Sequence, residues 1–100
     1  MAEKTKTDET VTRSYRIDVK LNGIPRSTYM VVTGIPKDLP PEYDNTIIMS
    51  AERQFAEALN TRRFLEFYTL GKSAKDEQPV FVNTDHVNEV QITEIVDVSL

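Results

Sequence analysis

The segment from residue 11 to residue 21, VTRSYRIDVKL, alternates along its length between two sets of side chains. From Tyr15 to Leu21 every second residue is apolar, and the residues between are polar. A period of two is typical of a β-strand with one buried and one solvated face. Asn22-Gly23 follows at once, and this dipeptide readily adopts the positive φ angles of a tight turn. The chain is therefore predicted to contain a β-hairpin that begins with this strand.

The return strand of the hairpin is predicted over residues 26–33, RSTYMVVT. Its register has two solutions. A two-residue loop pairs Ile17 with Thr28, whereas a loop one residue longer pairs Ile17 with Tyr29. We favour the longer loop, because it keeps the apolar side chains of both strands on one face.

A helix is predicted over residues 41–60, where apolar residues recur every four positions. The recurring residues are Tyr43, Ile47, Ala51, Phe55 and Leu59. Pro40 and Pro41 suit its first turn and Asp38 is a candidate cap, while Gly34-Ile35-Pro36 is expected to end the hairpin. An alternative makes residues 46–49 a short strand and begins a shorter helix at Ala51.

The last third of the chain alternates strands with turns. Strands are predicted over residues 64–70, 80–82 and 90–98, with a polar loop at 71–79 and a turn at 83–86. In the last strand Glu94 occupies an apolar position and Ile95 a polar one. A β-bulge or a second buried face would explain both exceptions.

The predicted fold is α+β with element order ββ-α-βββ, a small curled sheet or open barrel with one helix on one face. Residues 1–10 are expected to form a disordered tail, and residues 11–100 a single domain. One helix covers roughly 10 Å of sheet width, whereas five strands span about 20–25 Å. We therefore expect the chain to form a homo-oligomer that covers the rest of the sheet.

Charge and composition exclude several classes of protein. Sixteen Asp and Glu residues against twelve Lys and Arg give a net charge of −4, and no Lys or Arg follows Asp76. Direct nucleic-acid binding is not expected, because it requires clustered basic residues. The chain has no Cys, no apolar run of membrane-spanning length and no signal-peptide core, so we expect a cytoplasmic protein without disulfides.

No catalytic, cofactor or metal motif stands out. His86 is the only histidine, too few for a zinc site, and no nucleophile-elbow sequence surrounds any serine. The three glycines fall at expected strand ends, so none remains for a phosphate-binding loop. We predict no catalytic residues, no cofactor and no metal ligands.

The favoured function is therefore that of a small, non-enzymatic protein–protein interaction module that binds through a sheet face or edge. An alternative is an acidic inhibitor or immunity-type protein that blocks a basic nuclease or nucleic-acid-binding partner. The candidate partner-binding residues are Asp85, His86, Glu89, Glu94 and Asp97. A third hypothesis is an enzyme with its site at a subunit interface, where His86 would act as acid or base.

Overall fold

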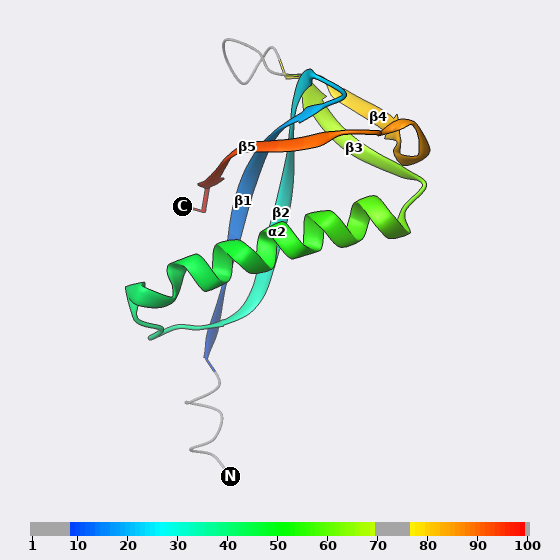
Figure 1. Ribbon diagram of the computed structural model, residues 1–100. Helices are drawn as coiled ribbons and strands as arrows, with labels where there is room; N and C mark the ends of the chain where they lie inside the picture. The colour runs from blue at the N-terminus through cyan, green and yellow to red at the C-terminus, as the bar shows by residue number, and fades with distance from the viewer. Residues whose placement is uncertain (1–8, 70–76, 100) are drawn as a thin grey trace.

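The computed structural model describes residues 9–69 and 77–99. Its elements are strands β1 (Thr10–Leu21) and β2 (Ile24–Pro36), a 3-10 turn η1 (Pro41–Tyr43), helix α2 (Asp44–Thr61), strands β3 (Phe64–Thr69) and β4 (Pro79–Asn83), a 3-10 turn η3 (Thr84–His86) and strand β5 (Val90–Asp97). The strands form one open antiparallel sheet of order β4-β3-β2-β1-β5, and α2 lies across one of its faces (Figure 1). The predicted ββ-α-βββ order of an α+β fold is confirmed.

The β1–β2 hairpin has the two-residue turn, so the register that the sequence analysis favoured is wrong. Asn22 and Gly23 have φ angles of 52° and 82°, and Ile17 pairs with Thr28 rather than with Tyr29. Two successive positive φ angles match the right-handed twist of a hairpin, which makes the shorter loop the favourable one. As a result Tyr29 belongs to the sheet face opposite the helix.

The hairpin is also longer than predicted, because Gly34-Ile35-Pro36 continues β2 instead of ending it. Gly34 has a φ of 72°, and the register shifts between Val11 and Arg13 on the partner strand. A glycine with positive φ accommodates the extra residue of a β-bulge, so the strand bends and goes on. Thr10, expected in the tail, belongs to β1 and pairs with Pro36 of β2. Residues 1–8 of that tail, residue 70 of the strand predicted over 64–70, and residues 71–76 of the predicted polar loop lie outside the described residues.

Helix α2 confirms the longer of the two predicted helices. It buries Ile47, Ala51, Phe55 and Ala58 against apolar residues of β1, β2 and β3. Asp38 does not cap it, because neither η1 nor α2 has a side-chain hydrogen bond at its N-cap. Asp44 in the first turn instead accepts a hydrogen bond from Arg13 of β1, at 3.0 Å.

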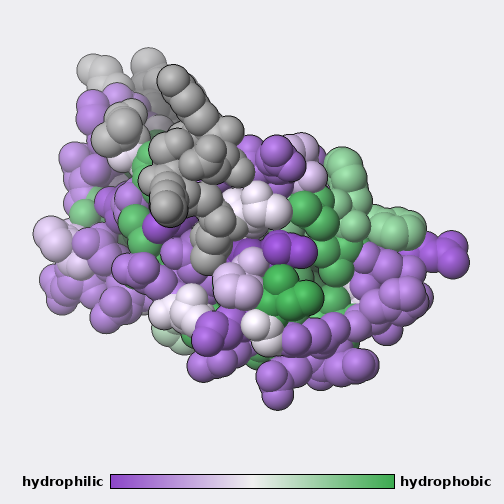
Figure 2. Space-filling model, turned by 90° about the horizontal axis from the view of Figure 1, so that it is seen from above, coloured by the Kyte–Doolittle hydropathy of each residue, from purple (hydrophilic) through white to green (hydrophobic). Residues whose placement is uncertain are grey.

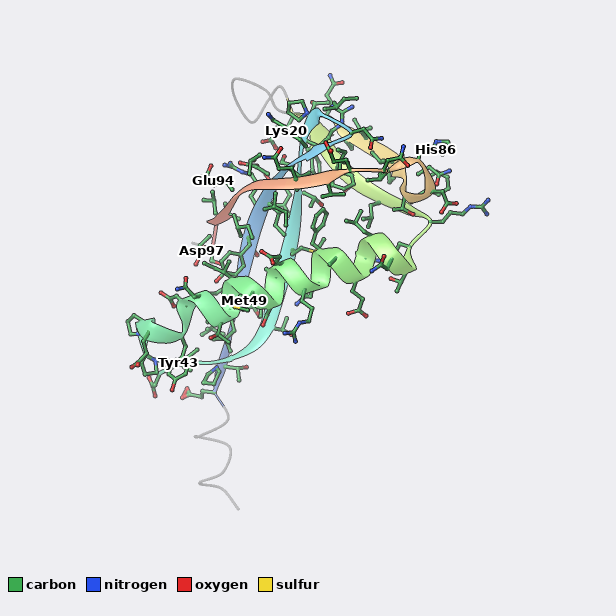
Figure 3. All side chains as sticks on the ribbon, viewed as in Figure 1. Lys20, Tyr43, Met49, His86, Glu94 and Asp97 are labelled. Carbon is green, nitrogen blue, oxygen red and sulfur yellow. The ribbon has the colours of Figure 1, made fainter. Side chains whose placement is uncertain are left out.

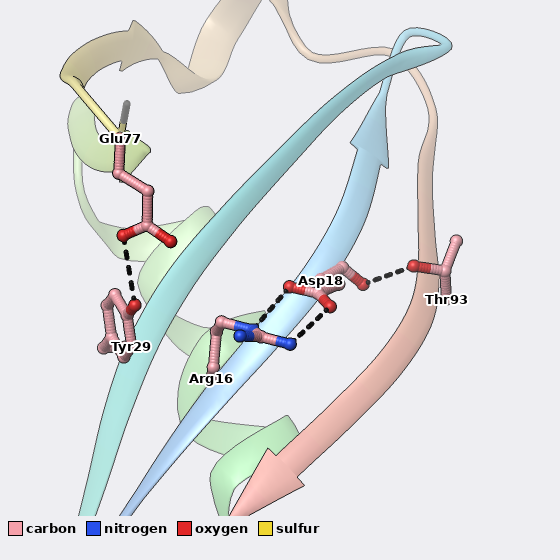
Figure 4. Close-up of polar contacts among 5 residues, drawn as sticks. All are labelled: Arg16, Asp18, Tyr29, Glu77 and Thr93. Carbon is pink, nitrogen blue, oxygen red and sulfur yellow. Dashed lines mark hydrogen bonds and ion pairs between the residues drawn. The ribbon is translucent and has the colours of Figure 1, made fainter. Parts of the chain in front are cut away.

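Of the two explanations offered for the last strand, a β-bulge or a second buried face, the bulge is present in β5. Asp18 pairs with Glu94, and the next residue of β1, Val19, pairs with Ile92, so Thr93 is the extra residue. Its hydroxyl donates to the main-chain carbonyl of Asp18 at 3.1 Å (Figure 4). Two residues thus separate Ile92 from Ile95, and both contact the core.

Candidate functional site

The sheet is nearly divided between β2 and β3. These two strands pair at only two positions, Arg26 with Thr69 and Ser27 with Tyr68. Elsewhere β3 diverges from β2 toward the C-terminal end of α2, where it begins (Figure 1). Most of β2 therefore has β1 on one side and no strand on the other, within the part of the chain that the structure describes.

A side chain marks the point where the two strands separate. The hydroxyl of Thr28, a buried residue, donates to the main-chain carbonyl of Glu66 at 3.1 Å. Continuing the ladder beyond Ser27 and Tyr68 would bring Tyr29 opposite Glu66. The Glu66 carbonyl would accept the next main-chain hydrogen bond of the ladder. It accepts one from the Thr28 hydroxyl instead.

The geometry of the hairpin determines which main-chain groups of β2 face this gap. In a two-residue hairpin the residues that flank the turn, Leu21 and Ile24, form a hydrogen-bonded pair, and such pairs recur at every second position. Thr28 and Met30 therefore direct their main-chain groups to β1. Tyr29 and Val31 direct theirs away from β1, into the gap.

A cavity of about 510 Å³ occupies the gap and continues to α2. Its floor is apolar, formed by Met30 of β2, Ala58 of α2 and Leu65 of β3. The helix side adds polar groups and the opposite side adds side chains of the outer sheet face. The full lining is Thr28, Tyr29, Met30, Val31, Gln54, Glu57, Ala58, Thr61, Arg62, Leu65, Glu66 and Tyr68. We call this cavity, together with the free edge of β2, the β2–β3 gap.

Two tyrosines and two carboxylates border the β2–β3 gap on the outer face. The rings of Tyr29 and Tyr68 meet edge to face, with centroids 5.5 Å apart. The Tyr68 hydroxyl donates to Glu66 at 2.7 Å, and the Tyr29 hydroxyl donates to Glu77 at 3.4 Å (Figure 4). The hydrogen bond to Glu66 raises the pKa of Tyr68, whereas desolvation, followed by the charge of Glu77, raises the pKa of Tyr29.

The nearest arginine on the same face is already engaged. Arg16, which pairs with Tyr29 across the ladder, makes two hydrogen bonds to the carboxylate of Asp18, at 3.0 and 3.3 Å (Figure 4). Among residues 9–69 and 77–99, no Lys or Arg forms an ion pair with Glu66 or Glu77. The border of the gap therefore carries negative charge that no described cation neutralises.

The candidate residues from the sequence analysis lie elsewhere, in two groups. Asp85 and His86 belong to the exposed turn η3 and Glu89 follows shortly after, while Glu94 and Asp97 lie on β5. Figure 3 shows His86 near the start of β5, and Glu94 and Asp97 toward its far end. The structure does not gather the five into one cluster.

The turn of the first hairpin holds the connection between β4 and β5. The side-chain amide of Asn22 donates to the His86 carbonyl at 2.8 Å, and its oxygen accepts from the main chains of Asn88 and Glu89 at 2.8 and 3.1 Å. Beside this contact Ile24 and Phe81 are 51% and 68% exposed. They line a shallow cavity of about 260 Å³ with Leu21, Val82 and Val87. Figure 2 looks down on this end of the molecule and shows apolar side chains gathered there.

The described ranges offer no cluster of three His, Asp or Glu side chains that would hold a metal ion. No helix in them is long and apolar enough to cross a bilayer. Comparisons with protein families, with curated proteins and with solved structures find no match for this chain.

The sequence analysis did not single out Tyr29, Glu66 or Tyr68 as site residues, because their proximity depends on where β3 leaves β2. One sequence signal bears on the site. The nine residues 27–35, STYMVVTGI, contain no charged side chain although they include the exposed Tyr29 and Val31.

Proposed function

We propose that this protein is a non-enzymatic interaction module that binds an extended segment of a partner protein along the free edge of β2. The observation that supports this most directly is the β2–β3 ladder, which stops after two residue pairs. It leaves the main-chain groups of Tyr29 and Val31 directed into an open cavity. Addition of a strand to such an edge is a recurring mode of peptide recognition, in which main-chain hydrogen bonds supply much of the affinity.

The contrast with the two outermost strands supports this choice. Natural sheets protect their edges with short strands, prolines, charges and bulges. Strand β4 has five residues and begins with Pro79, while β5 has a bulge and carries Glu94 and Asp97. The free part of β2 has no charge and no proline between Ser27 and Ile35. The edge without protection is thus the one inside the sheet, where it borders the cavity of about 510 Å³.

The acidic inhibitor remains the second candidate, supported by Glu94 on the exposed part of β5 beside Asp18. It predicts that changing Glu89 and Glu94 to Lys abolishes binding to a basic partner, and that this binding weakens steeply with salt.

Peptides of seven residues, TXVXVXT with X as Thr, Lys or Glu, test strand addition by fluorescence anisotropy. We expect at least one to bind the wild-type protein and Val31→Ala. Val31→Pro lacks the N–H that faces the gap and should bind at least tenfold more weakly. The N–H that proline removes is not hydrogen-bonded to β1. Val31→Pro should therefore stay folded, as measured by circular dichroism.

Peptides that are N-methylated at every second residue give the same test without changing the protein. The methyl groups can lie on the odd or on the even residues, and at least one of these two peptides should not bind. Failure of all three peptides to bind, or equal binding by Val31→Pro and Val31→Ala, would contradict the proposal.

A further inference from the structure

The two sides of the β2–β3 gap differ in chemistry, and the difference specifies the segment that fits it. Resting on the proposed function, we infer that the partner segment is an amphipathic strand with basic side chains on the outer sheet face and apolar side chains on the inner one. The inference follows from the alternation of side chains along a strand and from the residues that border each side of the gap.

The outer positions of an added strand lie beside acidic and aromatic groups. Directly paired residues in a sheet project to the same face, so the residue opposite Tyr29 projects to the outer face. Glu66 and Tyr68 of β3 border that position from the other side, because Tyr68 shares its face with Ser27 and hence with Tyr29. A Lys or Arg there would meet the Glu66 carboxylate and the rings of two tyrosines, which attract cations.

The charge around this position favours a cation over an anion. Glu66 and Glu77 each accept a hydrogen bond from a neutral tyrosine hydroxyl, which leaves their charges in place. Arg16 is paired with Asp18, and Arg62, the one cation of the cavity lining as described, follows the end of α2. An acidic side chain on the added strand would face like charges on the outer side.

The inner positions of the same strand project toward α2. Met30, Ala58 and Leu65 form the apolar floor there, and the last two are buried. An apolar side chain on the added strand would pack on this floor and would itself be removed from water. Alternation of basic and apolar residues is therefore the pattern that satisfies both sides of the gap.

A second copy of this chain fits the pattern less well. Three of its strands have an unpaired edge: β2, which carries no basic residue from Ser27 to Ile35, β4, which carries none at all, and β5, which carries Glu94 and Asp97. The strand of this chain that does combine basic and apolar residues, β1, is paired on both sides. The partner is accordingly a different protein.

The peptides TKVKVKT, TTVTVTT and TEVEVET, with wild-type protein, Glu66→Gln and Glu52→Gln, test the inference by fluorescence anisotropy. Glu52 is exposed on α2 outside the cavity lining, so its variant loses the same charge at a distance. We expect the Lys peptide to bind wild-type protein about tenfold more tightly than the Glu peptide at low salt, and the difference to shrink at high salt. Glu66→Gln should reduce this preference about two- to fivefold, and Glu52→Gln should leave it unchanged. TKSKSKT, with serine inward, should bind at least tenfold more weakly than TKVKVKT.

The outcomes separate the inference from the proposed function. Equal binding of the Lys and Glu peptides, or an equal effect of the Glu66 and Glu52 variants, would overturn the inference and leave strand addition standing. If no peptide binds and the protein instead forms a stable dimer that Val31→Pro disrupts, the occupant is a second copy, and the inference is wrong. If no peptide binds and Val31→Pro has no effect on any association, both fall.

Discussion

The hydroxyl of Thr28 donates to the main-chain carbonyl of Glu66 at 3.1 Å, and this bond joins β2 to β3 where their ladder ends. A threonine hydroxyl here satisfies a carbonyl that would otherwise lose its partner as the strands diverge. The hydrogen bond therefore has two roles. It holds β3 to β2, and it leaves the main-chain groups of Tyr29 without a strand opposite.

Replacing this hydroxyl should weaken the attachment of β3. We predict that Thr28→Val lowers the free energy of unfolding by about 1–2 kcal/mol, since the Glu66 carbonyl loses its partner while the shape of the side chain is kept. Urea denaturation measures the change. Thr33→Val makes the same substitution at an exposed position of β2 and should have little effect. Equal losses in both variants would show that the Thr28 bond contributes nothing specific.

Replacing Asn22 in the turn of the first hairpin should lower the stability of the protein. Asn22→Ala loses three side-chain hydrogen bonds and places a Cβ residue other than Asn at a φ of 52°, so we predict a loss of about 2–4 kcal/mol in stability. Asn22→Gly keeps the conformation of the turn and should lose less. The two variants, compared by urea denaturation, separate the effect of the backbone conformation from that of the three side-chain hydrogen bonds. A loss below about 0.5 kcal/mol in both would show that these hydrogen bonds do not stabilise the fold.

The two tyrosines at the gap, Tyr29 and Tyr68, should ionise at a higher pH than free tyrosine. Since the pKa values of Tyr29 and Tyr68 are raised in the folded protein, both hydroxyls should ionise above the ordinary value of about 10 in a phenolate absorbance titration. A raised folded pKa favours the protonated form, so the corresponding stability is present below pH 10 and is lost as pH rises through the folded value.

Glu66→Gln removes the negative charge next to Tyr68 and should lower the pKa of that hydroxyl toward its ordinary value. Tyr68→Phe identifies its contribution to the absorbance. A titration curve unchanged by Glu66→Gln would contradict the role assigned to that carboxylate.

The homo-oligomer expected from the sequence stays a prediction, and the free edge of β2 gives it a location. Without a partner, we predict weak, concentration-dependent self-association that sedimentation equilibrium would detect. Val31→Lys adds a charge to the exposed edge and should abolish it. A strong oligomer that is insensitive to Val31→Lys would place the subunit interface elsewhere, and a strict monomer would contradict the homo-oligomer.

The local elements of the fold could be predicted because each depends on residues close together in the sequence. The period of two before Asn22-Gly23 indicated the hairpin, and the spacing of Ile47, Ala51 and Phe55 indicated the helix. The predicted register is wrong because the geometry of the Asn22-Gly23 turn, rather than the matching of apolar side chains, sets the pairing. Tyr29 and Val31 are apolar and β-forming, yet the turn places both on the exposed face.

The candidate site could not be predicted in the same way. The gap exists because β2 and β3 separate after two residue pairs, and this separation depends on how α2 and β3 pack rather than on a local pattern. Glu66 and Tyr29 are far apart in the sequence and share a border only in the folded sheet. The acidic residues predicted from the sequence to bind a partner are instead spread over the turn η3, the residues that follow it, and β5.

Residue-resolved amide hydrogen exchange tests the free edge of β2 most directly. In the protein alone, the amides of Tyr29 and Val31 should exchange quickly, while those of Thr28 and Met30, bonded to β1, should be protected. Saturation with TKVKVKT should protect Tyr29 and Val31 and leave Thr28 and Met30 nearly unchanged. Strong protection of Tyr29 and Val31 in the dilute protein without peptide, or no added protection with it, would show that this edge is not the binding surface.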